Sequence, residues 1–388
     1  MKPHYLRRED QTLADMLPFE AITTPGFNPE QLHLLPGLEH TIVHQPDDDF
    51  AFLHEAAIIE FHGTLFAAWY NCPSHELKGH TPIRARRSTD GGKTWSDPET
   101  LAQDDSGQLL YCPPVFAVVH DTLYLLMNTM TAPDHIHSLE LHRYDERHRQ
   151  FRLLWSRPIP FKLNTNLCVA DDGTLFLPGR LAPRIDAFPD IPAILVADSQ
   201  APEGTWHAVP CTPSPYLPDR SRYIHPETSA IADSDSPTIT LFCRNDQRNV
   251  PLLFHSHDRG ASWSAPIAHN IPFSNSKIYA GTLPDRRRFL IGNLLPSPDF
   301  PGSRDRLAIY VSQPDSHLFS AGGLLQAGPN RSLNLFPQFS YPAATVTHDN
   351  RLLVLYTMVT TPDNQSRRGA ILTSIPLDLL PNSGGSVR

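Results

Sequence analysis

A short strand-like phrase recurs along the chain at intervals of roughly 50 to 65 residues, and this repeat limits the fold more than any other feature. Each copy starts with a turn residue or a polar pair and continues with apolar residues rich in Leu, Phe and β-branched types, as a buried strand requires. Most copies follow a second apolar run, so the repeating unit is a hairpin. The copies are GTLFAAWY (63–70), DTLYLLMNT (121–129), GTLFLPGR (173–180), PTITLFCR (237–244), RRFLIGN (287–293) and NRLLVLYT (350–357).

Six hairpins at near-regular spacing predict an all-β fold, a six-bladed β-propeller, in which radial repetition leaves only short, protected sheet edges. The 39 prolines and 20 glycines are spread along the whole chain, which favours frequent turns over long helices. A large β-sandwich or a parallel β-helix is the alternative, although sandwich strands recur at shorter intervals. We expect residues 46–388 to form one propeller domain and residues 1–45 to be an extension that packs on it or closes it.

Charge and cysteine content narrow the choice of partners. The formal net charge of −9 provides no basic field for nucleic acid or a membrane surface. The 5 cysteines are widely spaced and never form a CxxC pair, so we expect reduced thiols. No signal peptide or apolar span is visible, and a cytoplasmic location is the expectation. The sequence leaves the oligomeric state open.

A compact motif, S-x-D-x-G-x-[TS]-W, occurs at residues 88–95 and again at residues 256–263, with weaker echoes at 196–207 and 309–319. A motif that recurs in several repeats is a poor candidate for a unique catalytic centre. In each copy the Asp and the hydroxyl residues can hydrogen-bond the backbone of a tight turn, Gly can take a positive φ, and Trp can pack into its own blade. We therefore interpret the motif, called the Asp box below, as a scaffold element.

The propeller geometry indicates where a functional site should lie. The innermost strands of a propeller surround an axial funnel, and polar residues directly before these strands converge at one end of it. The repeat places His54 and Glu55, Cys112 and Pro113, Asn164 to Asn166, His225 to Glu227, Asn275 to Lys277, and Ser340 to Pro342 at this end. Asn164 and Lys277 are therefore candidate contacts for a ligand in the funnel.

The two Asp boxes on a six-repeat β chain resemble the sialidase (neuraminidase) superfamily and its relatives with BNR repeats, over residues from about 50 to about 375. The segment HPETSAIADSDSPTITLFCRND resembles the one that carries a glutamate before a strand and an arginine at the end of the next, which corresponds to Glu227 and Arg244. QFSYPAATVTHDNRLLVLYT resembles the segment with the tyrosine nucleophile, which corresponds to Tyr341. The resemblance implies that Glu227 takes the phenol proton while Tyr341 forms a covalent glycosyl intermediate, since a phenol with a pKa of about 10 needs a base at neutral pH.

The resemblance also implies a general acid in the loop after the first blade's hairpin, an aspartate in sialidases. Here the loop YNCPSHELKGHTPIRARRS has no aspartate, and Glu76 lies nearest to the expected place, with Glu55 in reserve. Either carboxyl would need a raised pKa to act as an acid.

Sialidases hold the substrate carboxylate with three arginines, because guanidinium groups bind carboxylates in a bidentate manner. Arg244 matches the second arginine, and Arg304 the third, with Arg306 as the alternative. The first is missing, because FLHEAAIIEF places His54 there. Further cationic contacts could come from Arg84 and Arg180.

No metal or cofactor is expected. The pair His135 and His137 lacks acidic or cysteine partners at ligand spacing, and the nucleotide and serine-hydrolase motifs are missing from the sequence. The prediction is an exo-glycoside hydrolase that releases a terminal, acidic sugar from a glycan through Tyr341. Two alternatives remain open: a carboxylate-only glycosidase acting on a uronic-acid or deoxy-sugar glycoside, and a glycan-binding propeller without catalysis.

Overall fold

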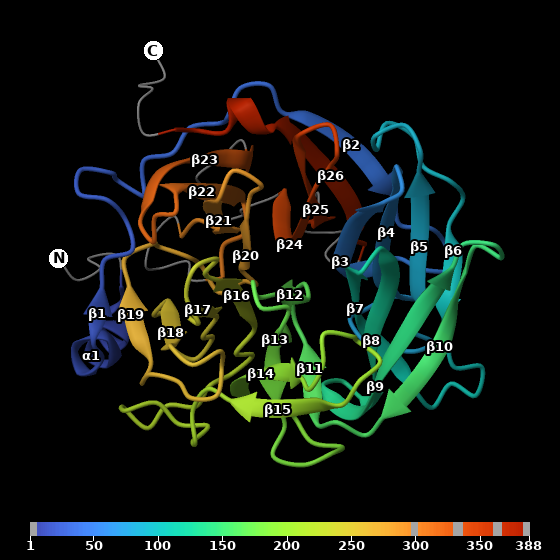
Figure 1. Cartoon of the computed structure of the whole chain (residues 1–388), viewed down its shortest axis with the longest axis horizontal. Coiled ribbons are helices and arrows are strands. Elements are labelled where there is room, and N and C mark those ends of the chain that lie inside the picture. The colour runs from blue at the N-terminus through green and yellow to red at the C-terminus, as the bar shows by residue number, and fades with distance from the viewer. Residues whose placement is uncertain (1–5, 296–301, 329–336, 360–366, 383–388) are drawn as a thin grey trace.

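The computed structural model describes residues 6–295, 302–328, 337–359 and 367–382, and within them the strands form six sheets around one axis (Figure 1). Each sheet is one blade, with its first strand next to the axis. The predicted six-bladed propeller is confirmed. Blade 1 comprises β3 (Phe52–Phe61), β4 (Thr64–Cys72), β5 (Ile83–Ser88) and β6 (Glu99–Ala102); blade 2 comprises β7 (Leu110–Val119), β8 (Thr122–Ala132), β9 (His135–Asp145) and β10 (Gln150–Arg157); blade 3 comprises β11 (Phe161–Leu163), β12 (Cys168–Val169), β13 (Leu175–Leu181), β14 (Ile191–Ala197) and β15 (Trp206–Pro210).

The other three blades follow the same order, and two of them include strands from the N-terminal segment. Blade 4 comprises β16 (Thr228–Ala232), β17 (Ile239–Cys243), β18 (Leu252–Ser256) and β19 (Ile267–His269), with β1 (Phe19–Glu20) added in parallel; blade 5 comprises β20 (Tyr279–Thr282), β21 (Arg287–Asn293), β22 (Arg306–Pro314) and β23 (Phe319–Ala327); blade 6 comprises β24 (Gln338–Val346), β25 (Arg351–Val359), β26 (Gly369–Pro376) and β2 (Glu39–His44). A 3-10 helix (Leu377–Leu379) follows β26.

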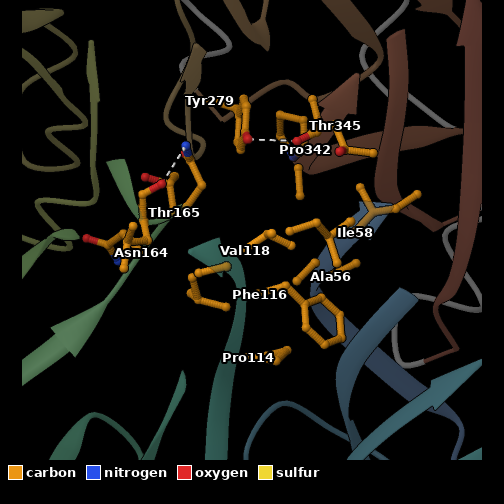
Figure 2. Close-up of a pocket in the computed structure, with 18 of the residues that line it drawn as sticks. Ala56, Ile58, Pro114, Phe116, Val118, Asn164, Thr165, Tyr279, Pro342 and Thr345 are labelled. Atoms are coloured by element: carbon orange, nitrogen blue, oxygen red, sulfur yellow. Dashed lines mark hydrogen bonds between the residues drawn. The ribbon is translucent and has the colours of Figure 1, made fainter. Parts of the chain in front are cut away.

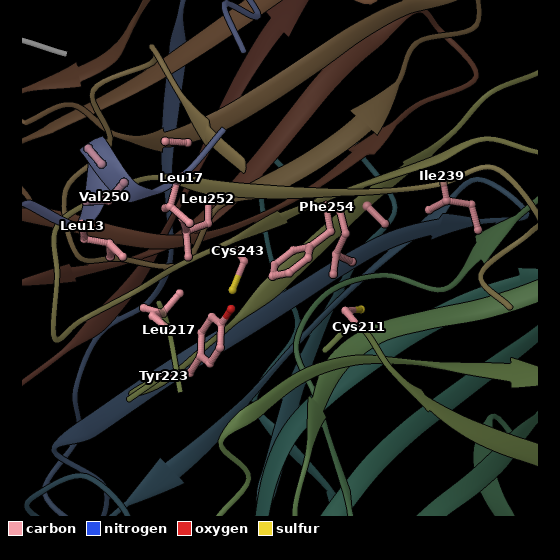
Figure 3. Close-up of a cluster of buried hydrophobic side chains, with 14 of the residues drawn as sticks. Leu13, Leu17, Cys211, Leu217, Tyr223, Ile239, Cys243, Val250, Leu252 and Phe254 are labelled. Carbon is pink, nitrogen blue, oxygen red and sulfur yellow. The ribbon is translucent and has the colours of Figure 1, made fainter. Parts of the chain in front are cut away.

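The N-terminal segment lies along the outside of blades 4, 5 and 6. Helix α1 (Arg8–Met16) buries Leu13 in the hydrophobic cluster of blade 4, where Leu252 and Phe254 also lie (Figure 3). Further along, β2 pairs antiparallel with β26, so residues near the N-terminus complete the sheet that the C-terminal strands began. The domain boundary at residue 45 stays a prediction. In the described part of the chain, no helix is long and apolar enough to cross a membrane.

Most of the hydrophobic core lies between neighbouring blades. For example, Ala57 and Phe66 of blade 1 share a cluster with Phe116 and Leu125 of blade 2. Further clusters of this kind join each of the other pairs of neighbouring blades, so each blade buries its faces against two others.

Strand direction divides the propeller into two faces. Apart from β1, adjacent strands within each blade are antiparallel, so the starts of the inner strands lie at the same face as the loops between second and third strands. We call this the site face. The turns between third and fourth strands lie at the opposite face. Both Asp boxes are turns of this second kind, in blades 1 and 4.

The two Asp boxes have matching hydrogen bonds. Ser88 Oγ donates to Asp90 Oδ1 (2.8 Å) and accepts from Gly92 N (2.9 Å), while the Asp90 carboxylate accepts from Thr94 N and Oγ1 (2.9 and 2.6 Å). The Nε1–H of Trp95 donates to Gly92 O (3.1 Å). The second box repeats each of these bonds with Ser256, Asp258, Gly260, Ser262 and Trp263.

The turn of each box requires glycine for two reasons: the backbone has a positive φ, and there is no space for a side chain. Gly92 and Gly260 both have φ of +87°, and a Cβ there would lie 2.6 Å from Leu372 Cδ2 and 2.4 Å from Ile194 Cδ1, respectively. Leu372 and Ile194 belong to the preceding blades. Each box therefore fixes a turn and packs it against the sheet of the preceding blade, at the face opposite the site face.

Candidate active site

Three inner strands depart from regular pairing where they reach the site face. The registers of β3, β7 and β24 shift at Glu55, Cys112 and Tyr341, respectively. Glu55 and Tyr341 also have positive φ, 47° and 59°, which is unusual for residues other than glycine. Bulges of this kind redirect side chains and are common next to active sites.

Tyr341 and Glu227 meet at one guanidinium nitrogen. Arg244 Nη1 donates to Tyr341 OH (2.6 Å) and to Glu227 Oε2 (2.6 Å). The phenol oxygen and the carboxylate oxygen are therefore no farther apart than the sum of these two distances. Tyr341 is 7% exposed and Glu227 3% exposed. The structure thus brings together three residues that were singled out by their resemblance to two separate sialidase segments.

Asp246 holds the same arginine from its other side. Arg244 Nε and Nη2 donate to the two oxygens of Asp246 (2.5 and 2.7 Å) in a bidentate pair. Four of the five N–H bonds of Arg244 are then engaged within the protein. Arg244 is therefore placed to fix Tyr341 and Glu227, and its contact with a carboxylate of a ligand stays a prediction.

The charges around this pair act in opposite directions on its two members. Burial by itself raises the pKa of Glu227, but the nearby Arg244, Arg180 and Lys277 outweigh it and lower that pKa to about 2. Burial raises the pKa of Tyr341, and Glu227 adds to this, whereas Arg244 and Arg304 oppose it. At neutral pH the site therefore contains an ionised carboxylate beside a neutral phenol.

A second buried carboxylate, Glu55, lies on the floor of the funnel. Lys277 Nζ donates to Glu55 Oε2 (2.7 Å) and to the backbone oxygen of Asn164 (2.9 Å). The thiol of Cys112 donates to Glu55 Oε1 over 3.6 Å. The side chain of Asn164 contacts the backbone of blade 4, since its Oδ1 accepts a hydrogen bond from Thr228 N. Glu55 and Lys277 thus form a buried ion pair directly under the Tyr341 ring, whose centroid is 5.0 Å from Lys277 Nζ.

His54 lies against Tyr341, with ring centroids 4.0 Å apart, and its Nδ1 is hydrogen-bonded to Thr357 Oγ1 (2.9 Å). Burial, reinforced by Arg368 and Arg304, lowers the pKa of His54 well below its ordinary value. His54 is therefore a neutral packing partner of Tyr341 and does not replace the positive charge of the missing first arginine.

Arg304 of blade 5 lies over the ring of Tyr341, and Arg368 of blade 6 lies near His54 and Arg304. The guanidinium carbon of Arg304 is 5.3 Å from the ring centroid of Tyr341, and Arg304 Nη2 donates to Asn275 O (3.2 Å). Arg368 stacks on Phe52 at 4.4 Å and contributes the largest charge effect on His54. Burial lowers the pKa of Arg304, and the like charges of Arg244 and Arg368 lower it further. Cations that repel one another in this way favour the entry of an anion.

A further ionic group lies toward blades 2 and 3. Lys162 and Arg180 both pair with Asp134. Arg180 is 1% exposed, and its Nε and Nη1 make no hydrogen bond within the described residues. Arg180 acts on the site as a buried charge, since it is among the cations that lower the pKa of Glu227.

The remaining predicted residues lie outside this cluster. Glu76 is exposed in the loop of blade 1 and accepts a hydrogen bond from Tyr70 OH (3.1 Å). Arg84 pairs with Asp47 (3.0 Å) and stacks on Phe50 instead of contacting Tyr341. Of the two candidates for the third arginine, it is Arg304 and not Arg306 that lies over Tyr341.

The loops between second and third strands surround the mouth of the funnel. One described residue of each loop is considered for its place beside the site; in blade order, these residues are Glu76, Asp134, Phe188, Asp246, Arg304 and Arg368.

Four of these residues, Asp134, Phe188, Asp246 and Arg368, were not predicted from the sequence. Asp246 could have been found from its place two residues after Arg244, directly beyond a strand end. The other three carry no local signal, because each lies in a loop whose position depends on the assembled ring.

An axial cavity of about 370 Å³ continues below the cluster (Figure 2). Inner-strand residues such as Ala56, Pro114 and Pro342 surround it, and Asn164 and Lys277 line it as well. The Glu55–Lys277 pair therefore lies at the boundary between the cavity and the reactive cluster. Among the described residues, no group of three or more His, Cys, Asp or Glu side chains is arranged to hold a metal ion.

The six sheets around one axis give the chain the fold of a sialidase-like β-propeller. Residues 63–354 match the family model described as a BNR repeat-like domain, and the chain belongs to that family. Comparison with curated proteins finds no significant match in sequence.

Solved structures share the fold at low sequence identity. A protein of unknown function from Dyadobacter fermentans is 14% identical, with a TM-score of 0.64 over 88% of this chain and 99% of that one. Trypanosoma rangeli sialidase is 13% identical, with a TM-score of 0.64 over 89% of this chain and 60% of that one. The Hadza microbial sialidase Hz136 is 16% identical, with a TM-score of 0.65 over 88% of this chain and 69% of that one. This chain thus spans 60% of the length of the trypanosomal enzyme.

Proposed function

We propose that the protein is a retaining exo-glycoside hydrolase that removes a terminal acidic sugar from a glycan, with Tyr341 as the nucleophile and Glu227 as its base. Tyr341 oxygen attacks the anomeric carbon as Glu227 takes the phenol proton, and the bond to the leaving oxygen breaks as that oxygen is protonated. Water then attacks the glycosyl–tyrosine intermediate, which releases the sugar and restores the phenol.

The observation that carries this proposal is the shared contact of Tyr341 OH and Glu227 Oε2 with Arg244 Nη1, each at 2.6 Å. The arrangement holds a neutral phenol beside an ionised carboxylate. Because Glu227 has a much lower pKa than Tyr341, the proton can leave only as the new C–O bond forms. Arg244 is positioned to stabilise the negative charge that develops on the phenol oxygen.

An acidic substrate is supported by Arg304 and Arg368. Arg304 lies over the ring of Tyr341, and Arg368 is close enough to Arg304 to lower its pKa, so a carboxylate beside the two guanidinium groups would reduce their mutual repulsion. A neutral nucleophile suits such a substrate, since a carboxylate nucleophile would repel it. Sialic acid is the first candidate, because the structural relatives named above include sialidases.

Glu76 is the better candidate for the general acid. Both oxygens of Glu55 are occupied, one by the ammonium of Lys277, so protonation of Glu55 would break a buried ion pair. Glu76 is exposed and can exchange protons with solvent.

Trapping of the intermediate tests the mechanism. Trypanosoma rangeli sialidase forms a covalent intermediate with 2,3-difluorosialic acid. We expect this reagent, or the fluorinated analogue of whichever acidic sugar the protein cleaves, to label Tyr341 in the wild type and to leave Tyr341→Phe unlabelled by mass spectrometry. Turnover that persists in Tyr341→Phe would instead favour the carboxylate-only route. Glycan binding without turnover in the wild type would favour a non-catalytic propeller.

A further inference from the structure

We infer that Lys277 is a positioning residue for the proposed reaction and that it acts through the ring of Tyr341, without a contact to the substrate. Its ammonium group, fixed in place by Glu55, stabilises the negative charge that the tyrosyl oxygen carries during both chemical steps. The inference rests on the proposed function, because it concerns the charge on the nucleophile.

Negative charge develops on Tyr341 in each step. In the first step the phenol gives its proton to Glu227 as its oxygen bonds to the anomeric carbon, and Glu76 protonates the leaving oxygen. In the second step water attacks that carbon and gives a proton back to Glu76. The bond to the tyrosyl oxygen breaks with its electron pair left on that oxygen, which recovers the proton from Glu227. A phenolate spreads its charge into the ring, so a cation over the ring face stabilises it.

Three cations lie over the ring of Tyr341. The distance to the ring centroid is 5.0 Å for Lys277 Nζ, 5.3 Å for the guanidinium carbon of Arg304 and 5.9 Å for that of Arg244. Arg244 donates a hydrogen bond to the phenol oxygen, and Arg304 is the proposed contact for the carboxylate of the substrate. Lys277 has neither of these tasks, and its contact with Tyr341 is with the ring.

Lys277 approaches the ring from the side of the axial cavity, which it lines, and its side chain is buried. Its Nζ donates to Glu55 Oε2 (2.7 Å) and to the backbone oxygen of Asn164 (2.9 Å). Two of its three N–H bonds therefore fix the ammonium beneath the ring. Because a substrate enters from the site face, Lys277 acts on the reaction through Tyr341.

The backbone on both sides of this contact is strained. Glu55 and Tyr341 have φ of 47° and 59°, and the register shifts of β3 and β24 lie at these two residues. One bulge carries the carboxylate that holds Lys277, and the other carries the ring that lies over it. Strain at two positions that serve one contact indicates a functional constraint.

Glu55 and Lys277 act on the phenol in opposite directions. Glu55 is among the groups that raise the pKa of Tyr341, whereas a cation over the ring favours the phenolate. Loss of the ammonium should therefore make the phenol harder to ionise, and loss of the Glu55 charge should make it easier. A purely structural role of the pair would not produce this difference in sign.

A polyfluorinated tyrosine incorporated at position 341 tests the inference, because its phenol is more acidic than that of tyrosine and its ionisation can be followed by absorbance. We expect Lys277→Met to raise the titration midpoint by about 1 pH unit and Glu55→Gln to lower it by about as much. Lys162→Met is the matched control, since it removes another buried lysine, paired with Asp134, and should shift the midpoint by less than about 0.3 unit.

An unchanged midpoint in Lys277→Met, or a rise in both variants, would overturn the inference. If Lys277→Met does not fold, Glu55→Gln decides by itself, because a midpoint that fails to fall there would also overturn it. The titration needs no turnover, so it gives an answer even if the wild type hydrolyses no glycoside and the proposed function fails.

Steady-state kinetics with the natural Tyr341 test the consequence for the reaction. We expect Lys277→Met to lower kcat about tenfold while KM changes less than about twofold, because the substrate does not contact Lys277. A rise in KM with kcat unchanged would instead make Lys277 a substrate contact and would contradict its role as a positioning residue.

Discussion

The two Asp boxes and the axial cluster are both networks of polar side chains, but their bonds join residues at very different distances along the chain. In the boxes, each partner lies within four residues of the other, and the same bonds occur in blades 1 and 4. In the cluster, Arg244 and Tyr341 are 97 residues apart, and Lys277 and Glu55 are 222 apart. The boxes can form from local sequence, whereas the cluster exists only when the ring has closed.

The two regions also hold carboxylates in the charged form by different means. Hydrogen bonds from Thr94 and Ser88 lower the pKa of the exposed Asp90 to about 2. Glu227 is buried, which raises its pKa, and neighbouring cations overcome that effect. Substitutions in a box should therefore lower the stability of the fold, whereas substitutions in the cluster should lower activity. Four sets of variants distinguish these two effects.

The largest effect is expected for Tyr341→Phe. Loss of the nucleophile should lower kcat by at least about 10³-fold, while the melting temperature changes little because Arg244 keeps Glu227 and Asp246. Steady-state kinetics and thermal melting of the same samples measure both quantities. A large fall in melting temperature would show that Tyr341 is mainly a structural residue.

Glu227→Gln should lower kcat by about 10² to 10⁴-fold, as expected for loss of a general base. Because the pKa of Glu227 in the folded protein, about 2, is below its ordinary value of 4.5, its stabilising effect is complete above about pH 4.5 and is lost as pH falls through about 2. Protonation of Glu227 should also lower kcat/KM, and this acidic limb of the pH profile should lie below pH 4. Lys277→Met should shift that limb to higher pH, and an unchanged limb would contradict the assignment.

Arg304→Met should raise KM for acidic glycosides by roughly 10 to 100-fold and leave neutral glycosides almost unaffected, because it removes one charged contact. Arg306→Met is the matched control, since Arg306 is two residues away and does not lie over Tyr341. Equal effects of the two variants would remove Arg304 from the substrate site.

The smallest effect on activity is expected in the boxes. Ser88→Ala leaves the buried N–H of Gly92 without its acceptor and should lower the free energy of unfolding by about 1 to 2 kcal/mol, with kcat/KM unchanged. Ser256→Ala should have the same effect. Exchange of Thr94→Ser and Ser262→Thr is the control and should be nearly neutral. Chemical denaturation measures all four, and unequal losses would show that the boxes are not equivalent.

The propeller could be predicted because its signals are local. Each hairpin has its own apolar pattern and turn, so six weak signals at regular spacing add up. The starts of the inner strands then followed from topology, which is why Glu55, Glu227, Lys277 and Tyr341 could be expected at one end of the axis.

The contacts among those residues could not be predicted in the same way. Bulges turn Glu55 and Tyr341 toward the axis, and no sequence pattern marks them. Arg84 carries a positive charge that could bind an acidic substrate, but it forms an ion pair with Asp47 instead. Arg368 reaches the cluster because β26 begins directly after it, beside β25 of the blade that carries Tyr341.

The sequence alone determined the repeat, the box turns and the face at which a site would lie, because these depend on residues close together along the chain. Only the tertiary structure decided that Arg244 is held by Asp246, that Glu55 is paired with Lys277, and that Arg304, not Arg306, lies over Tyr341. The physical reason is that charge interactions depend on distance and burial, and closure of the ring sets both.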